Sequence, residues 1–237
     1  GVGALMLSCA WLLLRDRNPL ERLPKPHSAP SAERGTVLPL LLTRRFAAIV
    51  FATGSLWFVI MALTQHQSIH LARDVGLERS LLPTVFSLFF GSSIIGKLSF
   101  GLLADRFDLH RVMAIAILIL AAALIALSQM TATSMTLLYG YAIFAGLGFS
   151  GAFTCIQVLI AAHYSGPLYG RVLATLVMID TLCGALGTQT AARLREWRGD
   201  YDLALLGMAV LAAMSALIIL RLGRLSYSSM TMAPAAS

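Results

Sequence analysis

The sequence has few charged residues for its length. Only 12% of its 237 residues are Asp, Glu, Lys or Arg, whereas 58% are hydrophobic and the mean hydropathy is +0.79. Soluble globular domains carry about 25% charged residues. This shortage excludes an ordinary soluble enzyme, a disordered chain and a nucleic-acid-binding domain, although the formal net charge is +7. A membrane protein is often basic because its cytoplasmic loops collect Lys and Arg.

Cysteine is also scarce. The three cysteines, Cys9, Cys155 and Cys183, all lie within apolar runs, where cysteine behaves as a small hydrophobic residue. They form no Cys-x-x-Cys pair, and the sequence has no cysteine-rich metal cluster or complete Walker motif. His66 and His70 have the i, i+4 spacing of a metal-binding pair, but no third ligand is evident nearby. We therefore expect no disulfide, no metal and no cofactor.

Six apolar segments are long enough to cross a membrane, which takes about 20 mostly apolar residues. They are residues 46–64, 81–103, 112–128, 135–162, 172–192 and 203–220. Residues 1–14 are too short to cross alone and follow no basic segment, so they resemble the tail of a preceding span rather than a signal peptide. We predict an all-α membrane protein with a six-helix transmembrane bundle at residues 46–221.

The positive charges predict the orientation of this bundle. Residues 15–45 hold seven Lys and Arg residues and five prolines, a composition typical of a flexible cytoplasmic linker between membrane bundles. Threading the chain from this linker gives the side of each connection. The cytoplasmic parts are 104–111, 163–171 and the tail 222–237, and the outer parts are 65–80, 131–134 and 193–202. The expected location is the cell membrane, and the Ala- and Leu-rich composition is compatible with a bacterial inner membrane.

Two charged residues lie deep within predicted spans. A helix rises 1.5 Å per residue, so Lys97 lies about 10 Å and Asp180 about 12 Å from the cytoplasmic ends of their spans. A charge in a bilayer costs at least about 2.5–3.5 kcal/mol and usually faces a cavity or a partner. Lys97 is therefore a candidate to bind a substrate carboxylate, and Asp180 to accept a proton or act as a counter-ion. The alternatives are a structural ion pair between them, or a lysine that reaches back to the membrane surface.

Polar and small residues of the fourth span are weaker candidates. Gln157 is a possible substrate ligand, but hydrogen bonding between helices explains it equally well. Four glycines of the same span either let another helix pack closely, the interpretation we favour, or let the span bend. These glycines are Gly140, Gly146, Gly148 and Gly151.

A charged turn follows the second predicted span. It resembles the loop motif G-x-x-x-D-[RK]-x-G-[RK]-[RK] of the major facilitator superfamily. The matching residues are Gly101, Asp105, Arg106 and, offset by one position by His110, Arg111. Asp108 and Leu109 stand where the motif has its second glycine and the next basic residue. By this resemblance, the loop latches the cytoplasmic side of the protein shut in one conformation.

The resemblance extends over nearly the whole chain. A basic linker followed by six spans, with the motif between the second and third, is similar to the C-terminal half of a major facilitator, so we expect an N-terminal six-span half as its partner. Residues 161–172 and 179–187 look like the corresponding region of monocarboxylate and oxalate/formate type members. In such members a basic residue at the position of Lys97 is implicated in anion binding. The resemblance implies secondary transport of a small organic anion, driven by a proton or by exchange for a counter-solute.

Two other function classes stay open from the sequence. Gly148-Phe-Ser150-Gly151 has the G-x-S-G pattern of an intramembrane serine protease. Such a serine needs a histidine base, yet His163 lies about 19 Å from Ser150 along the same helix, and the last span has no histidine. A sensor or scaffold that keeps the bundle without transport is the other alternative. We expect a transporter rather than an enzyme.

Overall fold

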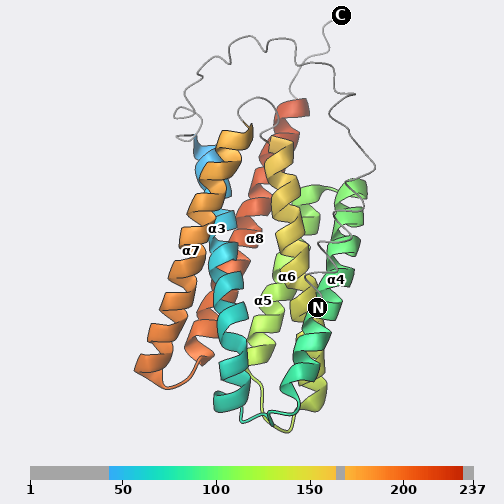
Figure 1. Cartoon of the computed structure of the whole chain (residues 1–237). Coiled ribbons are helices and arrows are strands. Elements are labelled where there is room, and N and C mark those ends of the chain that lie inside the picture. Colours follow the sequence, from blue (N-terminus) through green and yellow to red (C-terminus); the bar gives the residue numbers. More distant parts are fainter. Residues whose placement is uncertain (1–42, 164–168, 232–237) are drawn as a thin grey trace, which may run out of the picture. The chain divides into compact units, whose positions relative to one another are not determined.

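The computed structural model describes residues 43–163 and 169–231, and within them the chain is built from long helices (Figure 1). In chain order these are α3 (Arg44–Ile69), the short π-helix η2 (His70–Asp74), α4 (Leu82–Arg106), α5 (Leu109–Ser128), α6 (Met135–His163), α7 (Tyr169–Arg198) and α8 (Asp202–Thr231). The predicted span tail 1–14 and nearly all of the predicted linker 15–45 lie outside the described residues.

Six of these helices confirm the predicted membrane spans. In the described part of the chain, six helices are long and apolar enough to cross a membrane, with mean hydropathies of 1.5–2.6 in their most apolar windows. The prediction of an all-α bundle is therefore confirmed. The helices extend beyond the apolar segments: α3 begins at Arg44, inside the expected linker, and α8 runs to Thr231, past the boundary expected at residue 221.

The largest difference lies at the end of the first span, where we expected an outer loop from residue 65. The helix continues to Ile69 and then widens into the π-turn of η2. Several of its polar side chains are buried or half-buried, unlike those of a loop, because neighbouring helices supply hydrogen-bond partners. Gln67, for example, is 3% exposed and accepts a 2.7 Å hydrogen bond at Oε1 from the Tyr141 hydroxyl of α6.

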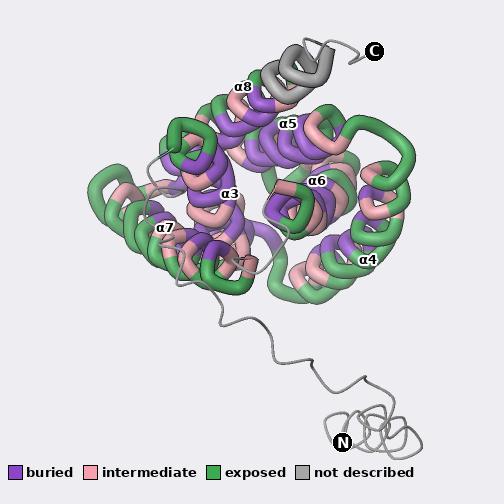
Figure 2. Tube along the Cα trace, turned by 90° about the horizontal axis from the view of Figure 1, so that it is seen from above, coloured by how far each residue is buried: buried purple, intermediate pink, exposed green. Residues whose placement is uncertain are grey.

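The helices form two rows when viewed along their axes (Figure 2). In the front row α7, α3, α6 and α4 follow one another, and α8 and α5 lie behind them. The main packing pairs are α4 with α6, α3 with α7, and α5 with both α6 and α8, whereas α3 and α6 barely touch. Thus α4 packs on α6 as α7 packs on α3, the arrangement expected for two three-helix repeats of inverted topology.

Glycines bring the paired helices close together. A Cβ atom at Gly146 of α6 would collide with the Phe89 backbone of α4, and one at Gly151 would lie 2.5 Å from the Phe100 ring. On the other side of the bundle, Gly187 of α7 lies against the Phe58 backbone of α3. Gly148 of α6 also lies against α5. Close packing, the interpretation favoured for the glycine-rich span, therefore describes Gly146, Gly148 and Gly151, whereas Gly140 has open space.

The connections at the lower end of Figure 1 are short, and we call this the lower end of the bundle, formed by residues 75–81, 129–134 and 199–201. Gly76 and Gly199 have positive φ angles there, which glycine adopts without strain. At the opposite end, Asp108 caps α5, because its Oδ1 accepts a 2.9 Å hydrogen bond from the Arg111 backbone N–H.

Large apolar side chains cover the outside of the bundle, where Figure 2 marks exposed residues. On α4 the exposed fraction is 64% for Ile94 and 68% for Leu98, and on α7 it is 60% for Leu182. A water-soluble protein rarely exposes such a continuous apolar surface. Lipid chains, or another apolar helix bundle, are the surroundings that suit these faces.

Candidate functional site

Asp180 lies in the middle of α7 and is 2% exposed. Thr53 of α3 donates a 2.9 Å hydrogen bond from Oγ1 to Oδ1 of this carboxylate. The two helices can approach here because Gly54 has no side chain: a Cβ atom at that position would lie 2.9 Å from Cys183 Sγ and 3.7 Å from Asp180 Oδ1. Within the described residues, Asp180 forms no ion pair. A carboxylate is thus held inside the bundle with a hydroxyl as its partner.

Lys97 lies on α4, and its exposed side chain reaches towards α6. Its Nζ is 5.8 Å from the ring centroid of Phe153, a distance suited to a cation–π contact. No acidic side chain of the described ranges pairs with it. The structural ion pair with Asp180, one of the alternatives read from the sequence, is therefore not formed.

Aromatic side chains connect the regions of Lys97 and Asp180. Phe153 of α6 meets Trp57 of α3 edge to face, with ring centroids 5.8 Å apart. Trp57 lies one helical turn after Thr53, the partner of Asp180. This row of side chains extends from α4 through α6 and α3 to α7, and it joins α6 to α3, which otherwise barely touch. We call the row Lys97, Phe153, Trp57, Thr53 and Asp180 the transverse row.

Gln157 lies one helical turn after Phe153 on α6 and is exposed. Its side-chain amide therefore lies on the same face of α6 as Phe153, the aromatic residue that α6 contributes to the transverse row. The predicted site residues thus come from the front-row helices, but the contact between them runs through Trp57 and Phe153. The sequence did not single out Phe153, because one phenylalanine among many apolar residues carries no signal of its own.

The charged turn between α4 and α5 is exposed. Asp105 and Arg106 end α4, and Arg111 lies in the first turn of α5, all with exposed side chains. Among the described residues none of the three forms an ion pair, and the Arg111 contact is made by its backbone N–H. Gly101 has open space at its Cβ position. The turn is thus available to a partner that is not part of the described bundle.

Ser150 has the surroundings of a packing residue rather than a nucleophile. It is fully buried, and its hydroxyl donates to the Leu147 carbonyl oxygen of its own helix at 3.2 Å. His163 bonds instead to the Leu159 carbonyl oxygen. The run 146–151 also has the spacing G-x-G-x-x-G of a dinucleotide fingerprint, but it lies inside α6 rather than at a strand-to-helix turn.

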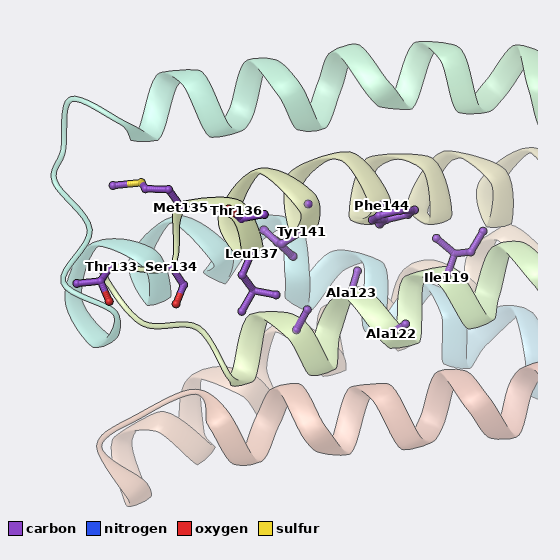
Figure 3. A pocket seen from close by; sticks show the side chains of 12 residues that line it. Ile119, Ala122, Ala123, Thr133, Ser134, Met135, Thr136, Leu137, Tyr141 and Phe144 are labelled. Carbon is purple, nitrogen blue, oxygen red and sulfur yellow. The ribbon is translucent and has the colours of Figure 1, made fainter.

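A large cavity lies elsewhere, between α5 and α6 towards the lower end (Figure 3). Its volume is about 850 Å³, and its walls include the small residues Ala122, Ala126 and Gly140 together with Phe144. None of the predicted site residues lines it, and no charged side chain does. It is an apolar groove with little means to recognise a charged solute.

The lower end holds a polar cluster that sequence reasoning missed. His66 and His70 are the residues considered there as a metal pair, but their ring nitrogens contact protein groups from distant parts of the chain. The described residues contain no group of three or more potential ligands that could hold a metal ion. The i, i+4 spacing of the two histidines was the signal available in the sequence. It identified the correct part of the chain, but it suggested a metal ion rather than the protein groups that the rings contact.

Sequence comparison places this architecture in a family. The sequence model of the Major Facilitator Superfamily matches residues 1–188 and, in a second overlapping match, residues 67–231. No curated protein matches the chain. The family match covers well over half of the sequence, and it agrees with the six membrane-capable helices of the described residues. The chain therefore belongs to the major facilitator superfamily, a family of multi-pass membrane transporters that move small molecules rather than transform them.

Proposed function

We propose that this six-helix bundle is one half, by resemblance the C-terminal half, of a secondary active transporter for a small organic anion, coupled to a proton or to exchange. The observation that carries the proposal is Asp180: a carboxylate that is 2% exposed in the middle of a membrane span, with a threonine hydroxyl as its hydrogen-bond partner. Such a residue is costly in a membrane and is usually retained for a functional reason.

Lys97 supplies the charge that an anion requires. Its ammonium is exposed and has no carboxylate partner among the described residues, so the charge is available to a solute. Phe153, which lies beside Lys97, and Trp57, which contacts Phe153, suit the apolar part of a small organic acid, and Gln157 offers an amide for a further hydrogen bond. A monocarboxylate, which combines one charge with a short apolar group, fits this set of side chains.

Asp180 is suited to the coupling step. A buried carboxylate with one hydroxyl donor exists either as an anion or, after binding a proton, as a neutral acid. When Asp180 is neutral, Lys97 is the uncompensated charge of the transverse row, and an incoming carboxylate balances it. Proton and anion would therefore bind together, which is the requirement for symport.

Transport requires a second bundle. In transporters of this kind two repeated bundles rock about a site at their interface, so that it opens to each side of the membrane in turn. The exposed apolar faces of α4 and α7 and the free charged turn at 101–111 suit contact with such a bundle. The predicted orientation places that turn on the cytoplasmic side of a cell membrane, by composition a bacterial inner membrane.

Uptake into liposomes tests the proposal. One sample contains the 237-residue chain alone, and a second contains the product of the complete reading frame that encodes it. We expect the second sample to take up lactate or formate saturably under an inward proton gradient, or in exchange for internal carboxylate, and the first to take up neither. Saturable uptake by the chain alone would contradict the half-transporter. Absence of carboxylate uptake from both samples would reject the anion transporter and favour a sensor or scaffold.

A further inference from the structure

A polar cluster ties together four elements at the lower end of the bundle. We call it the lower-end cluster and define it by His66 at the end of α3, His70 and Asp74 in η2, Arg195 in α7 and Tyr201 before α8. Arg195 Nη2 lies 2.8 Å from Asp74 Oδ1, and its guanidinium lies 5.1 Å from the centroid of the Tyr201 ring. The cluster surrounds a π-turn, a feature that occurs frequently at functional sites.

His70 is placed between two hydrogen-bond acceptors. Its Nδ1 lies 3.1 Å from Asp74 Oδ2, and its Nε2 lies 3.3 Å from the Leu127 carbonyl oxygen of α5. A carbonyl oxygen only accepts, and Asp74 is kept as a carboxylate by the Arg195 guanidinium beside it. A neutral imidazole has one N–H, so only the doubly protonated ring makes both bonds.

The surroundings of His70 also favour a positive charge. The Leu127 carbonyl belongs to the last turn of α5, where the helix dipole attracts a cation. Asp202, at the start of α8, interacts electrostatically with His70 and adds a second carboxylate. Arg195 opposes this charge but is already paired with Asp74, and Arg198 interacts electrostatically with Asp202. With 3% exposure, His70 has almost no water to replace these partners.

His66, one turn earlier on the same helix, provides the contrast. Its Nε2 lies 3.0 Å from the Thr188 carbonyl oxygen, and its Nδ1 lies 2.7 Å from the Tyr201 hydroxyl. Burial raises the pKa of Tyr201, so this hydroxyl keeps its proton and is able to donate it to Nδ1. One N–H, on Nε2, therefore satisfies His66. Two neighbouring histidines thus differ in the number of protons that their partners require.

We propose that His70 is a proton-binding site that joins the lower ends of α3, α5 and α7 when it is protonated. Loss of one proton leaves a ring nitrogen with a lone pair that faces either the Asp74 carboxylate or the Leu127 carbonyl, and that contact becomes repulsive. The link from η2 to α5, or the link from η2 through Asp74 to Arg195 of α7, is then broken. The lower end is therefore joined when the ring carries both protons and loosens when it loses one.

This site is distinct from the proposed substrate site and involves none of its residues. Its proton binds without any solute, so the two proposals are tested separately. If the bundle does transport, the cluster provides a constraint on the movement of α5 and α7 at the lower end that depends on the His70 protons. If it does not, the proton-binding site stands by itself.

The experiment is nitrogen NMR of the full chain in lipid nanodiscs with isotope-labelled histidine. The variants His70→Gln and His66→Gln assign the two signals among the five histidines. At about pH 6 we expect protons on both ring nitrogens of His70 and on Nε2 alone of His66. A His70 ring with one bare nitrogen at about pH 6 would overturn the proposal.

Amide hydrogen exchange provides the structural readout. At constant pH, His70→Gln should speed exchange of the Val75 and Met130 amides about fivefold, the effect of losing one hydrogen bond of ordinary strength. His66→Gln is the matched control and should leave Met130 unchanged, because His66 does not contact α5 among its described partners. Equal exchange in His70→Gln and the native chain would show that the ring does not join these ends. If His70→Gln fails to fold, replacing the four other histidines one at a time assigns the His70 signal by elimination, and the NMR of the native chain still decides.

Discussion

Thr53 and Asp180 join the middles of α3 and α7 through a buried 2.9 Å hydrogen bond. Asp180 therefore has two properties: its carboxylate packs against α3, and it carries a titratable charge. A substitution can separate the two. Asparagine keeps the oxygen that Thr53 donates to and has nearly the same shape, but it neither ionises nor binds a proton. The substitution Asp180→Asn therefore removes the charge while it keeps the hydrogen bond.

We expect Asp180→Asn to lower proton-driven carboxylate uptake at least about tenfold in the complete transporter, equivalent to about 1.4 kcal/mol. Its thermal unfolding temperature in detergent should stay the same or rise, since an unpaired buried charge is removed. Glu196→Gln, on the exposed end of the same helix, is the control and should keep native uptake. Native proton-driven uptake by Asp180→Asn would refute the coupling role.

Lys97 is the residue expected to bind the anion. Replacing it by glutamine should weaken carboxylate binding by about 1.5–3 kcal/mol, the usual strength of a hydrogen bond to a charged group, which is at least about tenfold in Kd. Lys97→Arg should retain part of the affinity because it keeps the charge. Trp57 fluorescence is a suitable measurement, since its ring contacts Phe153, which lies beside Lys97.

The control for this titration is Arg171→Gln, which removes an exposed positive charge near the start of α7. It should leave carboxylate binding unchanged. A fluorescence response that Trp57→Phe does not abolish would come from another tryptophan and would not report on this site. Equal affinity of Lys97→Gln and the native chain would show that the lysine is only a surface charge.

The fold was predictable from sequence because membrane spans are set by a simple physical requirement. A run of about 20 apolar residues is needed to cross a bilayer, and the six runs found in the sequence are the six long helices of the described chain. Helix ends were harder to predict. Residues 65–74 are polar and resemble a loop, but partners on α5, α6, α7 and the α7–α8 connection allow the helix to continue.

The candidate site was predictable only in part. Lys97 and Asp180 stand out in the sequence because a charge inside an apolar run is costly. Contacts between residues far apart in the sequence do not stand out: Thr53 lies 127 positions from its partner Asp180, and Tyr201 lies 135 positions from its partner His66. Such pairs depend on which helices pack together, and a hydrophobicity pattern contains no information on that choice.

The glycines of α6 give a prediction on stability. A Cβ at Gly146 would collide with the Phe89 backbone and the Ser92 hydroxyl of α4, whereas one at Gly140 meets no atom within 4 Å. Gly146→Ala should therefore destabilise the bundle by about 1–3 kcal/mol through overpacking, while Gly140→Ala should be neutral or stabilise it by up to about 1 kcal/mol. Thermal unfolding of the two variants in the same detergent measures the difference. Equal unfolding temperatures would contradict the close packing of α4 and α6.

The turn between α4 and α5 allows a functional role to be separated from a structural one. Asp105 and Asp108 are both exposed, three residues apart, but only Asp108 caps a helix, through its 2.9 Å bond from the Arg111 backbone N–H. Asp108→Ala should thus cost about 1 kcal/mol of stability. Asp105→Ala should leave the unfolding temperature unchanged, because within the described bundle its carboxylate has no ion-pair partner.

Transport should respond in the opposite way. If the turn latches against a second bundle, Asp105→Ala removes a contact that exists only in the complete transporter, and its uptake rate should fall several-fold while its stability stays native. Asp108→Ala should lose stability but keep its uptake rate per folded molecule. Uptake in liposomes, normalised to folded protein, distinguishes the two carboxylates. Native uptake by Asp105→Ala would show that the charged turn has no part in the conformational cycle. Because this substitution is expected to leave stability unchanged, a packing defect would not obscure the result.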